Sequence, residues 1–263
     1  GGGAFARPEA GEPGGVNEHP SVSLLEELSL NAYPGAGQLH YDGWTLQASP
    51  GRWRRANSVQ LMHPSTRPLD EKIAYCEAFY GARGKRTIFK LTRESDPELE
   101  PRLVARGYEF DAETSVQALE LQTAGPFSAF ADVSVQLDLT EAYAEAFYRI
   151  HAFDEADRAP WQVIQRCILP LMGYFGLWLD GEMIAAGVGV VERGWLGVFG
   201  VGTLQLAQRR GHALRLMRAM LAWGVEQGAT HSYLQVMRNN PAALALYERL
   251  GYREVYRYWY RQR

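Results

Sequence analysis

The chain has 263 residues, of which 46% are hydrophobic, and its formal net charge at pH 7 is −3. This length and apolar content suffice for one sizeable core or two small ones. The nearly balanced charge gives no reason to expect a nucleic-acid partner. No apolar run approaches the length of a membrane span and no signal peptide opens the chain, so we expect a soluble cytoplasmic protein without a membrane partner.

The first segment and the cysteines carry little chemistry. Residues 1–20 are rich in Gly, Pro and Glu and lack periodicity, which is typical of a disordered leader. The two cysteines, Cys76 and Cys167, both lie in apolar segments. We therefore expect buried, reduced thiols rather than a disulfide or a metal site.

A basic and aromatic segment, residues 51–58, precedes the first regular elements. One interpretation is a surface for an anionic group, such as a substrate carboxylate or phosphate, that faces a cleft. The other, which we favour, is a hairpin with solvated arginines. Beyond it, apolar spacing predicts a helix over 70–84, a strand over 86–92 and a short helix from Asp96 that ends at Gly107-Tyr108.

The composition changes around residues 121–126, where strand-like residues give way to small ones and Pro126. After this boundary the pattern predicts a strand over 133–137 and helices over 140–151 and 160–171. Strands over 173–179 and 183–191 follow, joined at Asp180-Gly181, a good hairpin turn.

The most informative stretch begins with an apolar run over 195–203, which is short and bounded like a buried strand. Gln208-Arg209-Arg210-Gly211-His212-Ala213 follows and opens a segment with helical apolar spacing. The first amide groups of a helix have no partner within it, and the helix dipole adds positive potential there. Gly211 has no Cβ that would hold a phosphate off. The order of strand, basic glycine turn and helix therefore predicts an anion site.

A second motif lies downstream. Residues 231–237 read as a strand and continue into Asn240-Pro241-Ala242-Ala243-Leu244-Ala245-Leu246-Tyr247-Glu248-Arg249-Leu250-Gly251-Tyr252. The first motif resembles the pyrophosphate loop of the GNAT N-acetyltransferase superfamily, Q/R-x-x-G-x-G/A. The second is similar to the family's N-x-x-A-x-x-L-Y-x-x-x-G-F/Y, with every spacing kept. The two linked motifs identify the chain as resembling a GNAT N-acetyltransferase.

The resemblance implies an α/β (α+β) fold with a mixed, mostly antiparallel sheet flanked by helices. It also implies acetyl-CoA as co-substrate, without a metal. The pantetheine arm would pair with strand backbone at Val201, Gly202 and Thr203. Gln208, Arg209, Arg210, Gly211, His212, Ala213 and Leu214 would surround the pyrophosphate, mainly through amide groups. Asn240 would orient the pantetheine amides, and it also suits the cap of the helix that Pro241 begins.

Tyr247 is the predicted catalytic residue. The equivalent tyrosine in many family members is assigned as the general acid that protonates the leaving thiolate, and a phenol near the sulfur can do so. The alternative is a core tyrosine beside Leu244 and Leu250 on an apolar helix face.

The residue at the position of the usual general base differs from the family pattern. Peptide-amine acetyltransferases of the superfamily often carry L-E-V on the strand before the Asn, whereas this chain has Leu234-Gln235-Val236. Because glutamine cannot accept a proton, other carboxylates become candidates: Glu192 at a strand end, and Asp154, Glu155 and Asp157 in an acidic loop. The same loop could attract a cationic amine, or it could be an ordinary solvated loop.

The N-terminal half repeats the order helix, strand, short helix and Gly-Tyr. Aligning Gly107-Tyr108 with Gly251-Tyr252 places Leu103 against Tyr247 and Asp96 against Asn240. This half has no Q-x-x-G-x-A loop. We therefore expect a tandem GNAT with a degenerate copy over 21–125 and a catalytic copy over 127–263.

The expected function is direct transfer of an acetyl group from acetyl-CoA to a primary amine of a small molecule or peptide, by a monomer or homodimer. Direct transfer is favoured because neither cysteine falls near the motifs. One alternative is a catalytically silent acyl-CoA sensor or scaffold. The other is a tandem-GNAT aminoacyl transferase, which would not need a CoA phosphate loop. The acceptor amine and the length of the acyl chain stay open.

Overall fold

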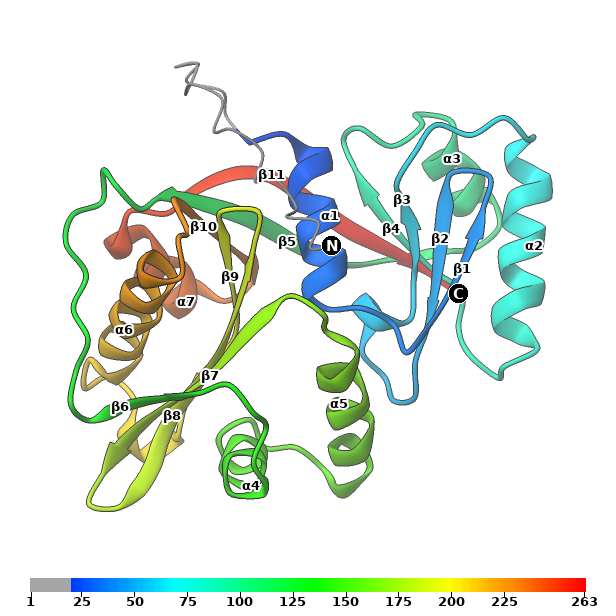
Figure 1. The fold of residues 1–263 in the computed structure, drawn as a ribbon. Helices are drawn as coiled ribbons and strands as arrows, with labels where there is room; N and C mark the ends of the chain where they lie inside the picture. The colour runs from blue at the N-terminus through cyan, green and yellow to red at the C-terminus, as the bar shows by residue number, and fades with distance from the viewer. Residues whose placement is uncertain (1–19) are drawn as a thin grey trace, which may run out of the picture.

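The computed structural model describes residues 20–263, which form a mixed sheet flanked by helices (Figure 1). The sheet has eleven strands in the order β1-β2-β3-β4-β11-β5-β10-β9-β8-β7-β6. Only β3 with β4 and β9 with β10 pair in parallel. The fold class expected from the sequence is confirmed. No helix within residues 20–263 is long and apolar enough to cross a bilayer.

The elements of the first half cover the segment up to residue 120. They are α1 (Val22–Ala32), β1 (Gly37–Tyr41), β2 (Trp44–Ala48), a 3-10 turn η1 (Arg54–Ala56), β3 (Val59–Leu61), α2 (Leu69–Gly81), β4 (Ile88–Thr92), α3 (Leu99–Ala105) and β5 (Glu109–Glu120).

The elements of the second half follow from residue 133. They are β6 (Val133–Gln136), α4 (Glu141–Ile150), α5 (Glu155–Cys167), β7 (Leu171–Leu179), β8 (Glu182–Glu192), β9 (Trp195–Thr203), η2 (Gln205–Ala207), α6 (His212–Glu226), β10 (His231–Met237), α7 (Pro241–Leu250) and β11 (Arg253–Gln262).

Most predicted elements occur where the apolar periodicity placed them, but one helix was misplaced. The helix expected over 160–171 begins at Glu155 and ends at Cys167. Pro160 lies inside this helix, in its second turn, where it removes one helix hydrogen bond instead of marking the start. The β7–β8 hairpin turns at Asp180 and Gly181, whose φ angles of 51° and 81° fit the predicted two-residue turn.

The two halves exchange their last strands. β11, the end of the second half, pairs with β4 and β5 of the first. β5, the end of the first half, pairs with β10 of the second. Figure 1 shows these two long strands running across the molecule and joining its two sides. Each half therefore completes its sheet only with the strand of the other.

The helix ends before the exchanged strands have the same geometry. After α3 the amide of Tyr108 donates to the carbonyl of Leu103 at 3.0 Å, and after α7 that of Tyr252 donates to the carbonyl of Tyr247 at 3.0 Å. Gly107 and Gly251 both adopt positive φ, which only glycine does without strain. These matching ends support the alignment of Leu103 with Tyr247 that the sequence predicts.

Helices cover the sheet on both faces. In the second half, α6 and α7 pack with Val198, Leu234 and Val236 in one core. On the opposite face, α1 and α4 share a core with Phe199 and Val188. A smaller core in the first half lies between α2, α3 and strands β2 to β4. Neighbouring residues of β9 and β10 thus point into different cores.

The strand exchange predicts that the halves unfold together. Leu91 in the first half and Leu221 in the second are both buried. Replacement of either with Ala should cost about 2–5 kcal/mol through loss of apolar contact and the remaining cavity. In urea titrations followed by circular dichroism and tryptophan fluorescence, both variants should show one coincident transition at lower urea.

The exposed Val104 on α3 supplies the control, because Val104→Ala should change the free energy of unfolding by no more than about 0.5 kcal/mol. Two transitions, of which Leu91→Ala moves only one, would show that the halves fold independently.

Candidate active site

Strands β9 and β10 separate in the middle of the second half. Their parallel pairing runs from Trp195 and His231 to Val198 and Leu234 and then stops, although both strands continue. The pairing of β9 with β8 shifts register at the same level, and Gly200 adopts φ 56°. The first unpaired residues are Phe199 and Gln235. From there on the facing edges of the two strands carry backbone groups that do not pair with each other.

The loop after β9 leads to a helix N-terminus without a side-chain cap. Gln208 fixes the loop because its Nε2 donates to the Thr203 carbonyl at 3.2 Å. Arg209 and Gly211 both have positive φ, and α6 starts at His212. No side chain of residues 20–263 accepts from the first amides of α6. Ser21, Thr140 and Asn240 cap α1, α4 and α7, whereas α2, α3 and α5 also lack a side-chain cap. The uncapped amides are free to bind an anion.

The corresponding loop of the first half is occupied by the protein itself. The carboxylate of Asp42 accepts from the amide of Thr66 at 3.0 Å and from that of Arg67 at 2.9 Å. The Thr66 hydroxyl and these amides hold the pKa of Asp42 well below its usual range. The buried Lys72 lies 3.2 Å from the same carboxylate. The loop before α2 therefore binds an internal anion.

Polar groups near the cleft also include Thr203 and Asn240. The Thr203 hydroxyl at the end of β9 is buried and has no hydrogen-bond partner within residues 20–263. Such a group costs free energy unless a ligand satisfies it. The Asn240 side chain accepts from the Ala243 amide at 3.1 Å, which is the capping role predicted from the sequence.

Tyr247 lies on α7, on the same side of the sheet as α6. It is 8% exposed and packs edge-on against Tyr252, with ring centroids 6.0 Å apart. Burial raises the pKa of its phenol to about 12, so it stays protonated at neutral pH. A protonated phenol can donate to a leaving thiolate, but the ordinary pKa of a thiol is lower, so this transfer requires a site that also raises the basicity of the thiolate, as removal from water does.

A cavity of about 160 Å³ lies on the other side of the sheet. Its walls come from both halves of the chain and are mostly aromatic: Ala32, Tyr33, Trp53, Arg55, Phe147, His151, Phe153, Trp161, Gln165, Ile168, Val188, Phe199 and Gly200. Because Phe199 and Gly200 also border the parting of β9 and β10, the cavity and the cleft meet there.

The basic segment 51–58 connects the antiparallel strands β2 and β3 and contributes to this cavity. Its favoured interpretation as a hairpin with solvated arginines holds for the exposed Arg52 but not for Arg55. Arg52 pairs with Asp157, and Arg54, at the start of the short turn η1, pairs with Asp111. The guanidinium of Arg55 instead lies 4.4 Å from the ring centre of Tyr33 and 5.7 Å from that of Phe199. The sequence alone could not show that this arginine meets a strand 144 residues further on.

Gln235 lies between Arg55 and the neighbouring strands. Its Oε1 accepts from Arg55 Nη1 at 3.3 Å and from the Tyr258 hydroxyl at 3.1 Å. Its Nε2 donates to the Ser29 hydroxyl at 2.7 Å. Gln235, which stands where the family often has Glu, therefore links α1, η1 and β11 by hydrogen bonds and carries no charge.

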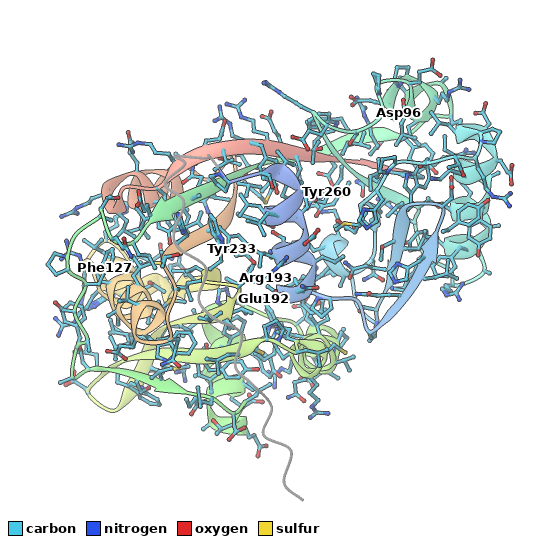
Figure 2. All side chains as sticks on the ribbon, turned by 45° about the horizontal axis from the view of Figure 1, so that its top comes forward. Asp96, Phe127, Glu192, Arg193, Tyr233 and Tyr260 are labelled. Carbon is cyan, nitrogen blue, oxygen red and sulfur yellow. The ribbon has the colours of Figure 1, made fainter. Side chains whose placement is uncertain are left out.

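The carboxylates considered as general base are engaged elsewhere. Glu192 accepts from Asn31 on α1 at 2.9 Å and lies beside Arg193 (Figure 2). The acidic loop is the start of α5: Asp154 is its N-cap residue, and Glu155 and Asp157 occupy its first turn. Asp157 is buried and pairs with Arg52 at 2.6 Å. None of these four residues lines the cavity.

His151 lines the cavity but is not among the side chains that the sequence motifs indicate. It ends α4, stacks on Phe147 and lines the cavity. Its Nε2 lies 3.0 Å from the Gly200 carbonyl, which can only accept, so Nε2 carries the proton and Nδ1 is a free base in the neutral ring. Burial lowers its pKa and favours this neutral form. The spacing of Phe147 and His151, four residues apart on one helix face, was the available signal.

Gly202 makes room for this histidine. A Cβ at position 202 would lie 2.6 Å from His151 Cε1, which is too close for any other residue without a shift. The strand segment predicted to hold the cofactor is therefore also shaped by the side chain at the end of α4.

The mixed sheet, the parted strands and the uncapped α6 N-terminus define the class of protein: a GNAT-superfamily N-acetyltransferase. The family model described as "Probable histone acetyltransferase Rv0428c C-terminal" matches residues 21–261. The chain belongs to this family.

Relatives extend over nearly the whole chain. The "Uncharacterized N-acetyltransferase YobR" of Bacillus subtilis is 23% identical over 244 residues, which is 91% of this chain and 98% of that protein. The fold resembles a GCN5-related N-acetyltransferase from Kribbella flavida, with TM-score 0.69 and 19% identity over 91% of this chain and 94% of that one. A tandem GNAT protein from the clavulanic acid biosynthesis pathway has TM-score 0.60 and 12% identity over 78% of this chain and 73% of that one.

His151 predicts a pH dependence of stability. Because its folded-state pKa is lowered below 6.5, the unfolded chain binds the proton more readily. The contribution of the neutral His151 ring to the free energy of unfolding is fully present above pH 6.5. It is lost as the pH falls from 6.5 through the folded-state pKa. His151→Gln should flatten this part of the profile in urea titrations between about pH 4 and 8.

The exposed His63 gives the matched variant, because His63→Gln should leave the profile unchanged. A profile of His151→Gln that is parallel to the wild type would contradict a buried, neutral histidine.

Proposed function

We propose that this protein is an acetyl-CoA-dependent N-acetyltransferase that passes the acetyl group directly to a primary amine. The observation that carries the proposal is the parting of β9 and β10 at Val198 and Leu234. On one face the opening is bordered by α7 with Tyr247 and by α6 with its free amides. On the other face it meets the cavity with His151.

The residues present fit acetyl-CoA. The uncapped amides of His212, Ala213 and Leu214, with the exposed Arg209 and Arg210 beside them, suit the pyrophosphate. The free edge of β9 at Val201 and Gly202 and the unsatisfied hydroxyl of Thr203 suit an amide-bearing arm. When bound, acetyl-CoA supplies the acetyl group as an activated thioester.

Two side chains divide the proton transfers. His151 Nδ1 takes the proton from the attacking amine, and the hydrogen bond from Nε2 to the Gly200 carbonyl holds the ring. Tyr247 gives its proton to the sulfur as the leaving group departs. Direct transfer is favoured because neither Cys76 nor Cys167 lines the cavity.

We further propose that residues 21–125 are a degenerate copy and residues 127–263 the catalytic copy. Leu103 stands where Tyr247 stands in the second half, at the same place before a matching helix end. The Asp42 carboxylate fills the loop that would hold a phosphate. The first copy therefore lacks an acid and a cofactor site, and its η1 turn supplies a wall of the acceptor cavity.

Acetyl-CoA binding can be tested with two matched glycines at the ends of α6. Gly211 and Gly228 have φ 83° and 85°, and a Cβ at either would meet open space. A Trp at either position should cost about 1–2 kcal/mol of backbone strain. Only Gly211→Trp should abolish binding of acetyl-CoA and free CoA in calorimetric titrations, because it fills the space beside the free amides.

Loss of binding in both variants would indicate general damage instead. Wild-type protein that binds neither ligand would overturn the cofactor site and with it the enzymatic proposal. Binding without transfer to a broad amine panel would favour the sensor.

The role of Tyr247 can be separated from its packing. Tyr247→Phe should lower kcat by about a hundredfold or more, since general acid catalysis contributes that much. It should hardly change thermal unfolding, because no residue of the described chain hydrogen-bonds this hydroxyl. Turnover can be followed by thiol release.

Tyr252→Phe should show the reverse. Its hydroxyl lies 2.7 Å from Ser232 Oγ in the core, so its loss should cost about 1 kcal/mol of stability while turnover persists. Unchanged kcat in Tyr247→Phe would remove this residue from the mechanism.

A further inference from the structure

The guanidinium of Arg55 lies at the opening between β9 and β10. It contacts both residues at which the pairing of these strands ends, Phe199 through its ring and Gln235 through Oε1. Arg55 also lines the cavity on the acceptor side. A positive charge thus faces the place where an acetyl acceptor would lie.

This charge has no counter-ion of its own. The nearby Arg52 and Arg54 each pair with an aspartate. Arg55 forms no ion pair with any carboxylate of residues 20–263, and the titratable side chains around it are tyrosines, which carry no charge at neutral pH. Contact with the Tyr33 ring offsets part of the cost of removing the guanidinium from water. A desolvated charge without a partner is otherwise costly, which favours a ligand anion there.

The neutral Gln235 is what leaves Arg55 without a partner. A carboxylate at the position of Gln235 Oε1, 3.3 Å from Arg55 Nη1, would neutralise the guanidinium internally. The amide of Gln235 instead offers a single oxygen without charge. A ligand carboxylate that binds in the bidentate manner needs two donors of the Arg55 guanidinium.

The cavity sets the size and character of the ligand. About 160 Å³ is close to the volume of an engineered cavity that holds one benzene molecule. Trp53, Phe147 and Trp161 give it apolar walls. Gln165 lines it too, is 5% exposed, and its Oε1 has no hydrogen-bond partner among residues 20–263. This oxygen would accept an N–H from the ligand.

We propose that the acceptor is a small amine that carries a carboxylate on an aromatic or aliphatic body, and that Arg55 binds this carboxylate. The identity of the ligand as acetyl acceptor rests on the function proposed above. Polyamines and basic peptide segments are disfavoured as acceptors because they would bring a second positive charge against Arg55.

Binding without turnover tests the anion site. Benzoate, benzamide and benzylamine share one ring and differ in charge. Each is titrated calorimetrically to about 10 mM, the range expected for ligands of so few atoms. Wild-type protein without acetyl-CoA should bind benzoate more tightly than benzamide and should not bind benzylamine.

Three variants locate the effect. Arg55→Gln should weaken benzoate binding by roughly thirtyfold or more and leave benzamide binding unchanged. Gln235→Glu should weaken benzoate about tenfold by supplying an internal counter-ion. Arg166→Gln removes an exposed positive charge next to Gln165 on α5 and should have no effect. Thermal unfolding checks that each variant is folded.

The proposal is overturned if benzoate does not bind wild-type protein, or if Arg55→Gln and Gln235→Glu both bind it normally. These readouts need no acetyl-CoA, so they stand even if acetyl transfer fails. With turnover, L-phenylalanine and phenethylamine form the matching acceptor pair. Arg55→Gln should raise KM for the first with little change in kcat. A fall in kcat alone, for both amines, would instead place Arg55 at the thioester carbonyl.

Discussion

The pairing of β5 with β11 is the interaction on which the rest of the structure depends. β5 ends the first half of the chain, and its other edge pairs with β10 of the second half. β11 ends the second half, and its other edge pairs with β4 of the first half. The exchange makes one continuous sheet and brings η1 and α1 of the first half against β9 and β10 of the second. The acceptor cavity exists because of this, since its walls come from both halves.

The two halves share one backbone pattern but differ in the charge next to the loop that precedes the helix. Both place a helix after a parallel strand, and both end the next helix at a glycine with positive φ. In the second half the helix amides lack a side-chain acceptor, so they can take a phosphate from solution. In the first half Asp42 already supplies the negative charge, and the buried Lys72 pairs with it.

The sequence predicted what is local and missed what is assembled across the chain. The strand over 231–237, the hairpin at Asp180-Gly181 and the cap at Asn240 follow from residues within a few positions of one another. The strand exchange leaves no local pattern. Nor does the contact of Arg55 with Gln235, 180 residues apart in sequence, which depends on that exchange. The start of α5 lies five residues before the predicted one because Pro160 favours the first position of a helix, whereas this helix contains it in its second turn.

The replacement at position 235 connects the chemistry to the choice of acceptor. A carboxylate there would serve as a base and would also neutralise Arg55. Gln235 cannot accept a proton, and in the mechanism we propose His151, held by its bond to the Gly200 carbonyl, is the base instead. The same amide leaves the guanidinium charged and unpaired beside the opening. In the proposal made above, the residue that removes the usual base therefore also leaves room for an anion, and a substrate with a carboxylate would supply the negative charge that position 235 does not carry.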